Sequence, residues 1–157
     1  TNFPSVFSMS NVLINIRFLS EIIFLHLYII YEMRRNLLVV CLLGALTILL
    51  GAFGAHTLKE YLSVEGLNSF ETGVKYQMYH VIVLLLVNTT SMLSIKMKNI
   101  ISSMFLAGIC FFSGSIYAIA FGFNPKMIWF VTPLGGLIFI LGWLKLGYEL
   151  YKNRKNT

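Results

Sequence analysis

The sequence contains no aspartate, and charged residues occupy only 11% of its 157 positions. Soluble proteins have about 25% charged residues on average. A small soluble domain exposes a large surface and needs charged side chains to cover it. So few charges exclude an ordinary soluble globular protein. The apolar content of 57% and the mean hydropathy of +0.79 indicate an integral membrane protein instead.

Cysteines are scarce, and the basic residues are not clustered. Cys41 and Cys110 both lie inside apolar runs, so the chain is not a disulfide scaffold. The net charge of +6 comes from lysines and arginines at the edges of hydrophobic stretches. A nucleic-acid-binding protein would gather them on one face with aromatic residues between them. We therefore expect a lipid bilayer as the partner of this chain, and no nucleic acid.

Four long apolar runs dominate the rest of the sequence. A helix needs about 20 mostly apolar residues to cross the hydrocarbon core of a bilayer. These runs are continuous, whereas strands of a membrane barrel alternate apolar and polar residues. We predict an all-α bundle of four transmembrane helices, with spans at about 37–55, 76–95, 100–123 and 127–144.

The first 32 residues do not follow this pattern. The segment 12–31 is apolar enough for a helix, yet it contains Arg17, Glu21 and His26. Arg17 and Glu21 are four residues apart and can pair, which lowers the insertion cost of about 2.5–3.5 kcal/mol per isolated charge. No small-residue cleavage site follows, so a signal peptide is a poor interpretation. We assign residues 1–32 to an N-terminal extension, either a start-site artefact or an extra interfacial helix, and residues 33–157 to the four-helix domain.

The orientation of the four spans follows from their flanking basic residues, which concentrate on the cytoplasmic side of membranes. One predicted side carries eight of these residues, namely Arg34, Arg35, Lys96, Lys98, Lys145, Lys152, Arg154 and Lys155, and the other carries Lys59, Lys75 and Lys126. This asymmetry predicts a multi-pass protein with both ends of the four-helix unit in the cytoplasm.

The loop between the first two spans is the most polar part of the chain. Ser63 can cap a helix whose first turn contains Glu65, and no proline interrupts residues 64–93. We predict one helix that begins outside the bilayer and continues inward as the second span. In the fourth span we expect Pro133 to kink the helix and to free a backbone carbonyl for Thr132.

Small residues mark helix contact faces inside lipid, because close packing drives helix association there. Three of the four spans contain them at helical spacing. The predicted packing residues are Gly44, Gly51 and Ala55 in the first span, Gly114, Ala118 and Gly122 in the third, and Gly135 and Gly142 in the fourth. We expect a tight bundle with little room for a wide pore.

Four motifs occur along the predicted spans: Gly51-Ala-Phe-Gly-Ala-His56, Glu71-Thr-Gly-Val-Lys-Tyr-Gln-Met-Tyr-His80, Phe112-Ser-Gly-Ser-Ile-Tyr117 and Thr132-Pro-Leu-Gly-Gly136, the last followed by Gly142-Trp143. Together they resemble the motifs of the YwdK/YgdD family of small bacterial membrane proteins, which implies the bacterial inner membrane as the location. The resemblance covers about Met33 to Tyr148 and implies a four-helix integral membrane domain that starts at Met33. It implies no activity and assigns no catalytic residue.

His80 is the sharpest candidate for chemistry, because ionisable residues inside a membrane are functional candidates by default. His56 and Glu71 are expected near the same interface, and Lys75 and Tyr76 complete a candidate functional cluster. As a functional site this cluster could bind a transition metal, ligate haem or relay protons. As a structural feature it would join the first two helices by hydrogen bonds. Two histidines and one glutamate at noncontiguous positions are a weak metal signal, so we expect no metal, cofactor or catalytic residue.

The sequence therefore leads to three functional hypotheses. The first is a non-enzymatic structural or assembly component of the membrane, with a membrane-protein partner or a second copy. The second is a transporter of small solutes, ions or protons that uses His80 and the polar strip of the third span, formed by Ser113, Ser115 and Tyr117. The third is a redox protein that binds a cofactor or a metal.

Overall fold

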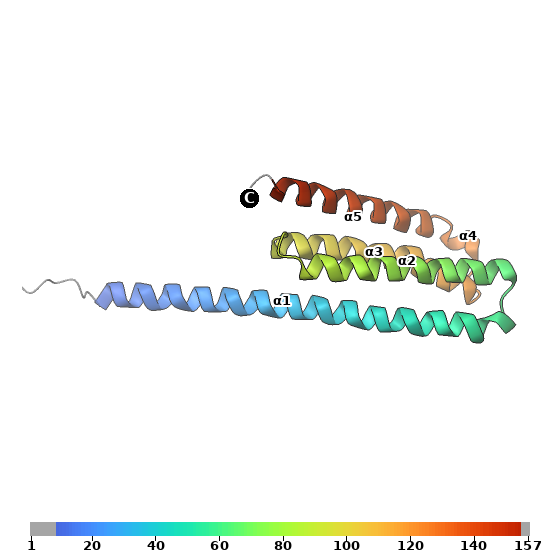
Figure 1. The fold of residues 1–157 in the computed structure, drawn as a ribbon, viewed down its shortest axis with the longest axis horizontal. Coiled ribbons are helices and arrows are strands. Elements are labelled where there is room, and N and C mark those ends of the chain that lie inside the picture. The colour runs from blue at the N-terminus through green and yellow to red at the C-terminus, as the bar shows by residue number, and fades with distance from the viewer. Residues whose placement is uncertain (1–8, 155–157) are drawn as a thin grey trace, which may run out of the picture. The chain divides into compact units, whose positions relative to one another are not determined.

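The computed structural model describes residues 9–154, and every regular element there is a helix (Figure 1). This confirms the predicted all-α fold class. The elements are α1 (Met9–His56), the 3-10 helix η1 (Leu58–Glu60), α2 (Val64–Thr89), α3 (Ile95–Ala120), α4 (Pro125–Ile128) and α5 (Val131–Arg154).

The chain divides into two compact units, residues 1–35 and 36–157, and the division falls inside α1. In the first unit the described residues form one helical segment. Two ion pairs lie along this segment: Arg17 Nε is 3.7 Å from Glu21, and Arg35 bonds Glu32. Large apolar side chains such as Phe18, Phe24 and other members of 14–31 are exposed on it. The N-terminal extension predicted over residues 1–32 is thus helical where it is described.

The second unit begins with the last part of α1 and continues through α5. Ser63 caps α2 as predicted, since its Oγ accepts the backbone N–H of Gly66 at 3.1 Å. α2 ends at Thr89, so the last residues of the predicted span 76–95 lie in a loop. Ser94 then caps α3, which starts five residues before the predicted span at 100–123 and ends at Ala120.

The fourth apolar run is divided where one continuous helix was expected. α4 ends at Ile128 and α5 begins at Val131. Pro133 therefore lies in the first turn of α5, where a missing N–H is tolerated, so the expected kink is replaced by a break before it. Thr132 was expected to bond a freed carbonyl, but its Oγ1 lies 2.6 Å from Ser115 Oγ on α3.

By length and composition, three helices of the described chain can cross a membrane: those within Ile16–Glu60, Ile95–Ala120 and Pro125–Lys152. α2 is long enough at 26 residues, but it contains Gln77, His80 and Asn88 among its apolar residues. These three polar side chains are buried against the other helices. That α2 also spans the membrane therefore depends on its length and its position in the bundle, and it stays a prediction.

Within the second unit α2 packs against the last part of α1 on one side and α3 on another, and α3 also packs against α5 (Figure 1). Leu84, Ile101 and Phe105 are completely buried in the resulting core. On α1, Gly44 faces Val81, Gly51 faces Val74, and Gly54 lies against Phe70.

Glycines also determine how closely α3 and α5 approach. A Cβ added at Gly135 would collide with the backbone of Phe111 and Phe112, and one at Gly142 would lie 2.9 Å from the Phe105 ring. Other predicted packing positions lie differently. Gly114 and Gly122 have no atom within 4 Å of an added Cβ, Ala118 is half-buried and Ala55 is exposed.

Candidate functional site

The five residues of the candidate functional cluster do not form one site. His56 is exposed at the end of α1. Lys75 Nζ lies 3.5 Å from Glu71 Oε2 in a largely exposed pair on α2. Among residues 9–154, no group of three histidine, cysteine or acidic side chains is placed to hold a metal ion. Tyr76 and His80 do lie together, one helical turn apart, with their rings stacked.

The side chain of His80 extends from α2 toward α5, and only 5% of the residue's surface is exposed. Its Nδ1 is 2.7 Å from the carbonyl of Tyr76, and Trp143 Nε1 donates to its Nε2 at 3.4 Å. A carbonyl can only accept and an indole N–H can only donate. The ring hydrogen therefore sits on Nδ1, and both ring nitrogens are engaged.

Aromatic rings surround His80 on several sides. Phe139 of α5 stacks on its ring with centroids 3.5 Å apart and planes at 6°, and Phe105 of α3 is 5.4 Å away. Trp143 meets it edge-on. Because these rings come from α3 and α5, His80 fixes α2 to both helices through packing as well as through a hydrogen bond.

A second set of polar groups joins α1, α2 and α3. Gln77 Nε2 donates to Thr47 Oγ1 at 2.8 Å, and Tyr117 OH donates to Gln77 Oε1 at 3.0 Å. Thr47 in turn donates to the carbonyl of Leu43 on its own helix. Both ends of the Gln77 amide are used, so this side chain connects three helices.

The serines of the predicted polar strip on α3 also bond neighbouring helices. Ser113 Oγ donates to the carbonyl of Gly73 on α2 at 2.7 Å. Ser115 Oγ donates to Phe112 O, which leaves Thr132 of α5 as the donor in the Ser115–Thr132 bond. The strip therefore serves as helix contacts.

The sequence reasoning missed a cluster of asparagines at the other end of α2. Asn36 Nδ2 donates to Asn88 Oδ1 at 3.2 Å and to Asn99 Oδ1 at 2.7 Å. Asn88 donates to Ser102 Oγ, and the buried Lys98 donates to the Asn88 carbonyl. The signal available in the sequence was one asparagine near the same end of each of three apolar runs.

Among the side chains that the structure describes, those of residues 14 and 16–152, no buried nitrogen or oxygen lacks a hydrogen-bond partner. In lipid an unpaired polar group costs several kcal/mol, so complete pairing is what a membrane bundle requires. Of the groups that the sequence singled out, His80 and the polar strip of α3 hold helices together, whereas His56 and the Glu71–Lys75 pair do not.

Residues 50–136 match the model of the family described as "Protein of unknown function (DUF423)". The chain belongs to this family. It is 39% identical over 121 residues to a UPF0382 membrane protein of Haemophilus influenzae, a match that covers 77% of this chain and 97% of the relative. The UPF0382 membrane protein SSP2132 of Staphylococcus saprophyticus is 39% identical over 71% of this chain and 95% of its own length. No solved structure shows significant similarity.

A further relative is the UPF0382 inner membrane protein YgdD of Escherichia coli, which is 36% identical over 70% of this chain and 84% of its own length. This confirms the family resemblance drawn from the four motifs. These relatives and the apolar helices together establish an integral membrane protein, in agreement with the composition.

Proposed function

We propose that this DUF423 protein is a non-enzymatic assembly component of the bacterial inner membrane, which acts by packing against another membrane protein or a second copy of itself. The observation that carries this proposal is the use of the buried polar side chains. His80, Gln77 and Asn88 each bond at least one other helix, so they stabilise a rigid unit.

The surface of the second unit supports the same proposal. Gly114 on α3 and Gly147 on α5 have open space where a Cβ would be. Small residues that face no helix of their own chain let a partner helix approach closely in lipid. A helix of another protein, or of a second copy, could therefore pack closely against α3 or α5 without any rearrangement of the helices of this chain.

The experiment is native electrophoresis and affinity purification in a mild detergent, comparing the unaltered chain with Gly114→Leu and Gly147→Leu. We expect a complex larger than the monomer, and its loss in one of the two variants. The free energy of unfolding should not fall, because neither position is packed and leucine is a better helix former than glycine. A purely monomeric chain with no co-purifying protein would contradict the proposal.

A flux assay separates this function from transport. In proteoliposomes we expect proton flux to be the same for the unaltered chain, His80→Phe and empty vesicles. A flux that requires the unaltered chain and disappears in His80→Phe would favour a transporter, provided that the variant keeps its fold.

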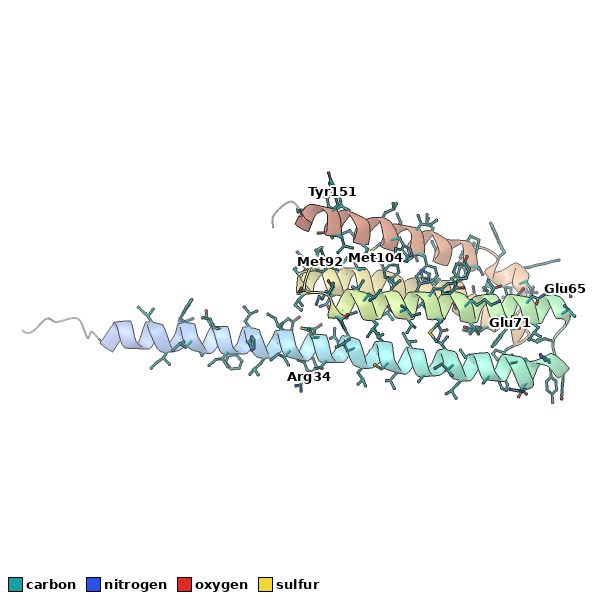
Figure 2. All side chains as sticks on the ribbon, in the orientation of Figure 1. Arg34, Glu65, Glu71, Met92, Met104 and Tyr151 are labelled. Atoms are coloured by element: carbon teal, nitrogen blue, oxygen red, sulfur yellow. The ribbon has the colours of Figure 1, made fainter. Side chains whose placement is uncertain are left out.

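We further propose that the end carrying the α2–α3 loop faces the cytoplasm. Lys96, Lys98 and Lys152 lie at that end, together with Met92 and Tyr151, whereas Glu65 and Glu71 lie at the opposite end (Figure 2). Basic residues concentrate in the short loops that lie on the cytoplasmic side of a membrane.

The test uses a membrane-impermeant maleimide on intact inner-membrane spheroplasts, in a background with both native cysteines replaced by alanine. We expect Glu60→Cys to react from outside, and Ser91→Cys to react only after the membrane is opened. The reverse labelling pattern would contradict the orientation.

A further inference from the structure

An apolar groove runs between α2 and α5 toward the α2–α3 loop. Its volume is about 430 Å³, and it is lined by Leu86 and Val87 of α2 and by Trp143, Leu146 and Leu150 of α5. At the loop the groove ends at Thr90 and Met92. It arises because α5 packs closely on α3, whereas rings such as His80 and Phe139 bridge the space between α2 and α5.

A second hollow, of about 510 Å³, adjoins the groove at Met92 and is far more polar. Ser91, Ser94, Glu149 and Lys152 line it. Glu149 is bonded by Lys145 Nζ at 2.8 Å, so these two charges neutralise each other. Lys152 is in no ion pair within the described residues and is exposed, which leaves the hollow with a net positive charge.

We propose that this pair of hollows binds one anionic phospholipid, with an acyl chain in the α2–α5 groove and the phosphate at the Ser91–Ser94 loop. The groove is apolar along its length, and the charge lies at one end only, which matches the distribution of polarity in a phospholipid. Lys152 attracts the phosphate electrostatically, and the serine hydroxyls can donate to it.

The dimensions agree with this occupant. Trp143 and Leu150 are seven residues apart on α5, which corresponds to about 10 Å of helix at 1.5 Å per residue. One leaflet provides about half of the 30 Å hydrocarbon core, so the groove accommodates most of one chain. A net-anionic headgroup fits better than a zwitterionic one, because the carboxylate that could bind an ammonium group is already paired with Lys145.

The first experiment is a thermal melt of the full chain in detergent, with phosphatidylglycerol, phosphatidylethanolamine or glycerol phosphate added. We expect phosphatidylglycerol to raise the melting temperature by several degrees, since a ligand that binds only the folded state stabilises it. An equal rise with phosphatidylethanolamine, an equal rise with glycerol phosphate alone, or no rise with any of them would overturn the proposal.

Two neighbouring exposed leucines provide a matched pair of variants. Leu86 lines the groove and is 62% exposed, whereas Leu85 is 43% exposed and lies outside it. Leu86→Trp fills the groove and should abolish the phosphatidylglycerol shift, while Leu85→Trp should keep it. If both variants responded alike, the groove would not be the binding site.

Native mass spectrometry gives an independent readout that does not depend on melting. We expect one phospholipid to remain bound to the unaltered chain and to Leu85→Trp, and to be lost from Leu86→Trp. Lys152→Gln should weaken phosphatidylglycerol binding about fivefold, the effect expected of one basic residue near a headgroup. An unchanged affinity in that variant would contradict the assigned position of the phosphate.

Discussion

The contact between α3 and α5 can be tested by adding a single methyl group. An alanine Cβ at Gly135 would lie 2.8 Å from the carbonyl carbon of Phe111 and from Cα of Phe112, and even closer to the Phe112 nitrogen. At the adjacent Gly136 the same Cβ would lie 3.8 Å from the Phe112 ring, which is an ordinary contact. The two substitutions therefore differ almost only in the space available.

The expected magnitude follows from that comparison. Glycine to alanine in a helix gains about 0.5–1 kcal/mol through backbone entropy, and both variants gain it alike. Overpacking costs about 1–3 kcal/mol when side chains can adjust. At Gly135 the obstructing atoms are backbone, so α3 and α5 must separate and loosen the contact of Gly142 with Phe105. We expect Gly135→Ala to be less stable than Gly136→Ala by about 3 kcal/mol, at the upper end of that range.

The assay is reversible unfolding by sodium dodecyl sulfate in mixed micelles, followed by circular dichroism and by tryptophan fluorescence. Trp143 reports on the relevant region because its ring packs on Phe105 with centroids 5.8 Å apart. Gly136→Ala should unfold at or slightly above the midpoint of the unaltered chain. Free energies of unfolding that agree within about 0.5 kcal/mol for the two variants would refute the close approach of the two backbones.

Substitutions at three further residues, His80, Asn88 and Glu71, test the remaining contacts by the same unfolding assay. His80→Phe should cost less than about 1.5 kcal/mol because it keeps the aromatic packing, whereas His80→Ala should cost about 3 kcal/mol or more by leaving a cavity; equal costs would mean that packing is not the role of this ring. Asn88→Leu removes two interhelical bonds and should cost about 1 kcal/mol, at about 0.6 kcal/mol per bond in membranes. Its control is Thr89→Val, which loses only bonds within α2, and a larger loss in the control would contradict the expectation. Glu71→Gln should change stability by less than about 0.5 kcal/mol, because its pair with Lys75 is largely exposed; a loss above 1 kcal/mol would show that the pair is not solvated.

The parts of the fold that depend on local chemistry could be predicted from the sequence. Ser63 caps α2 because its hydroxyl accepts one of the free N–H groups at the start of the helix, that of Gly66, and the acidic Glu65 in the first turn favours the helix dipole. The all-α class followed from runs of apolar residues that are long enough for a helix in lipid. Helix ends inside apolar sequence were less visible, since Met92 and Leu93 extend an apolar run past the true end of α2 at Thr89.

The contacts between helices could not be predicted in the same way. The periodicity of a sequence indicates which face of a helix is packed, but it does not indicate which other helix packs against that face. Gly114 and Gly135 have equivalent signals in the sequence, yet one has open space and the other lies against a backbone. The partner of His80 is 63 residues away at Trp143, and Asn36 bonds a residue 63 positions later at Asn99. No local pattern encodes separations of that length.

The position of α2 explains why its polar residues suggested chemistry. Gln77, His80 and Asn88 would each be costly against lipid, and a helix that carries all three is stable in a membrane only if other helices cover them. α1 and α3 cover α2, and His80 contacts α5. Each of the three polar side chains of α2 therefore forms a hydrogen bond to another helix. A loss of function in a variant of these residues consequently has two causes that activity alone cannot separate. The pair His80→Phe and His80→Ala separates them: chemistry at the ring would be lost in both variants, whereas a purely structural role would be lost only in the second.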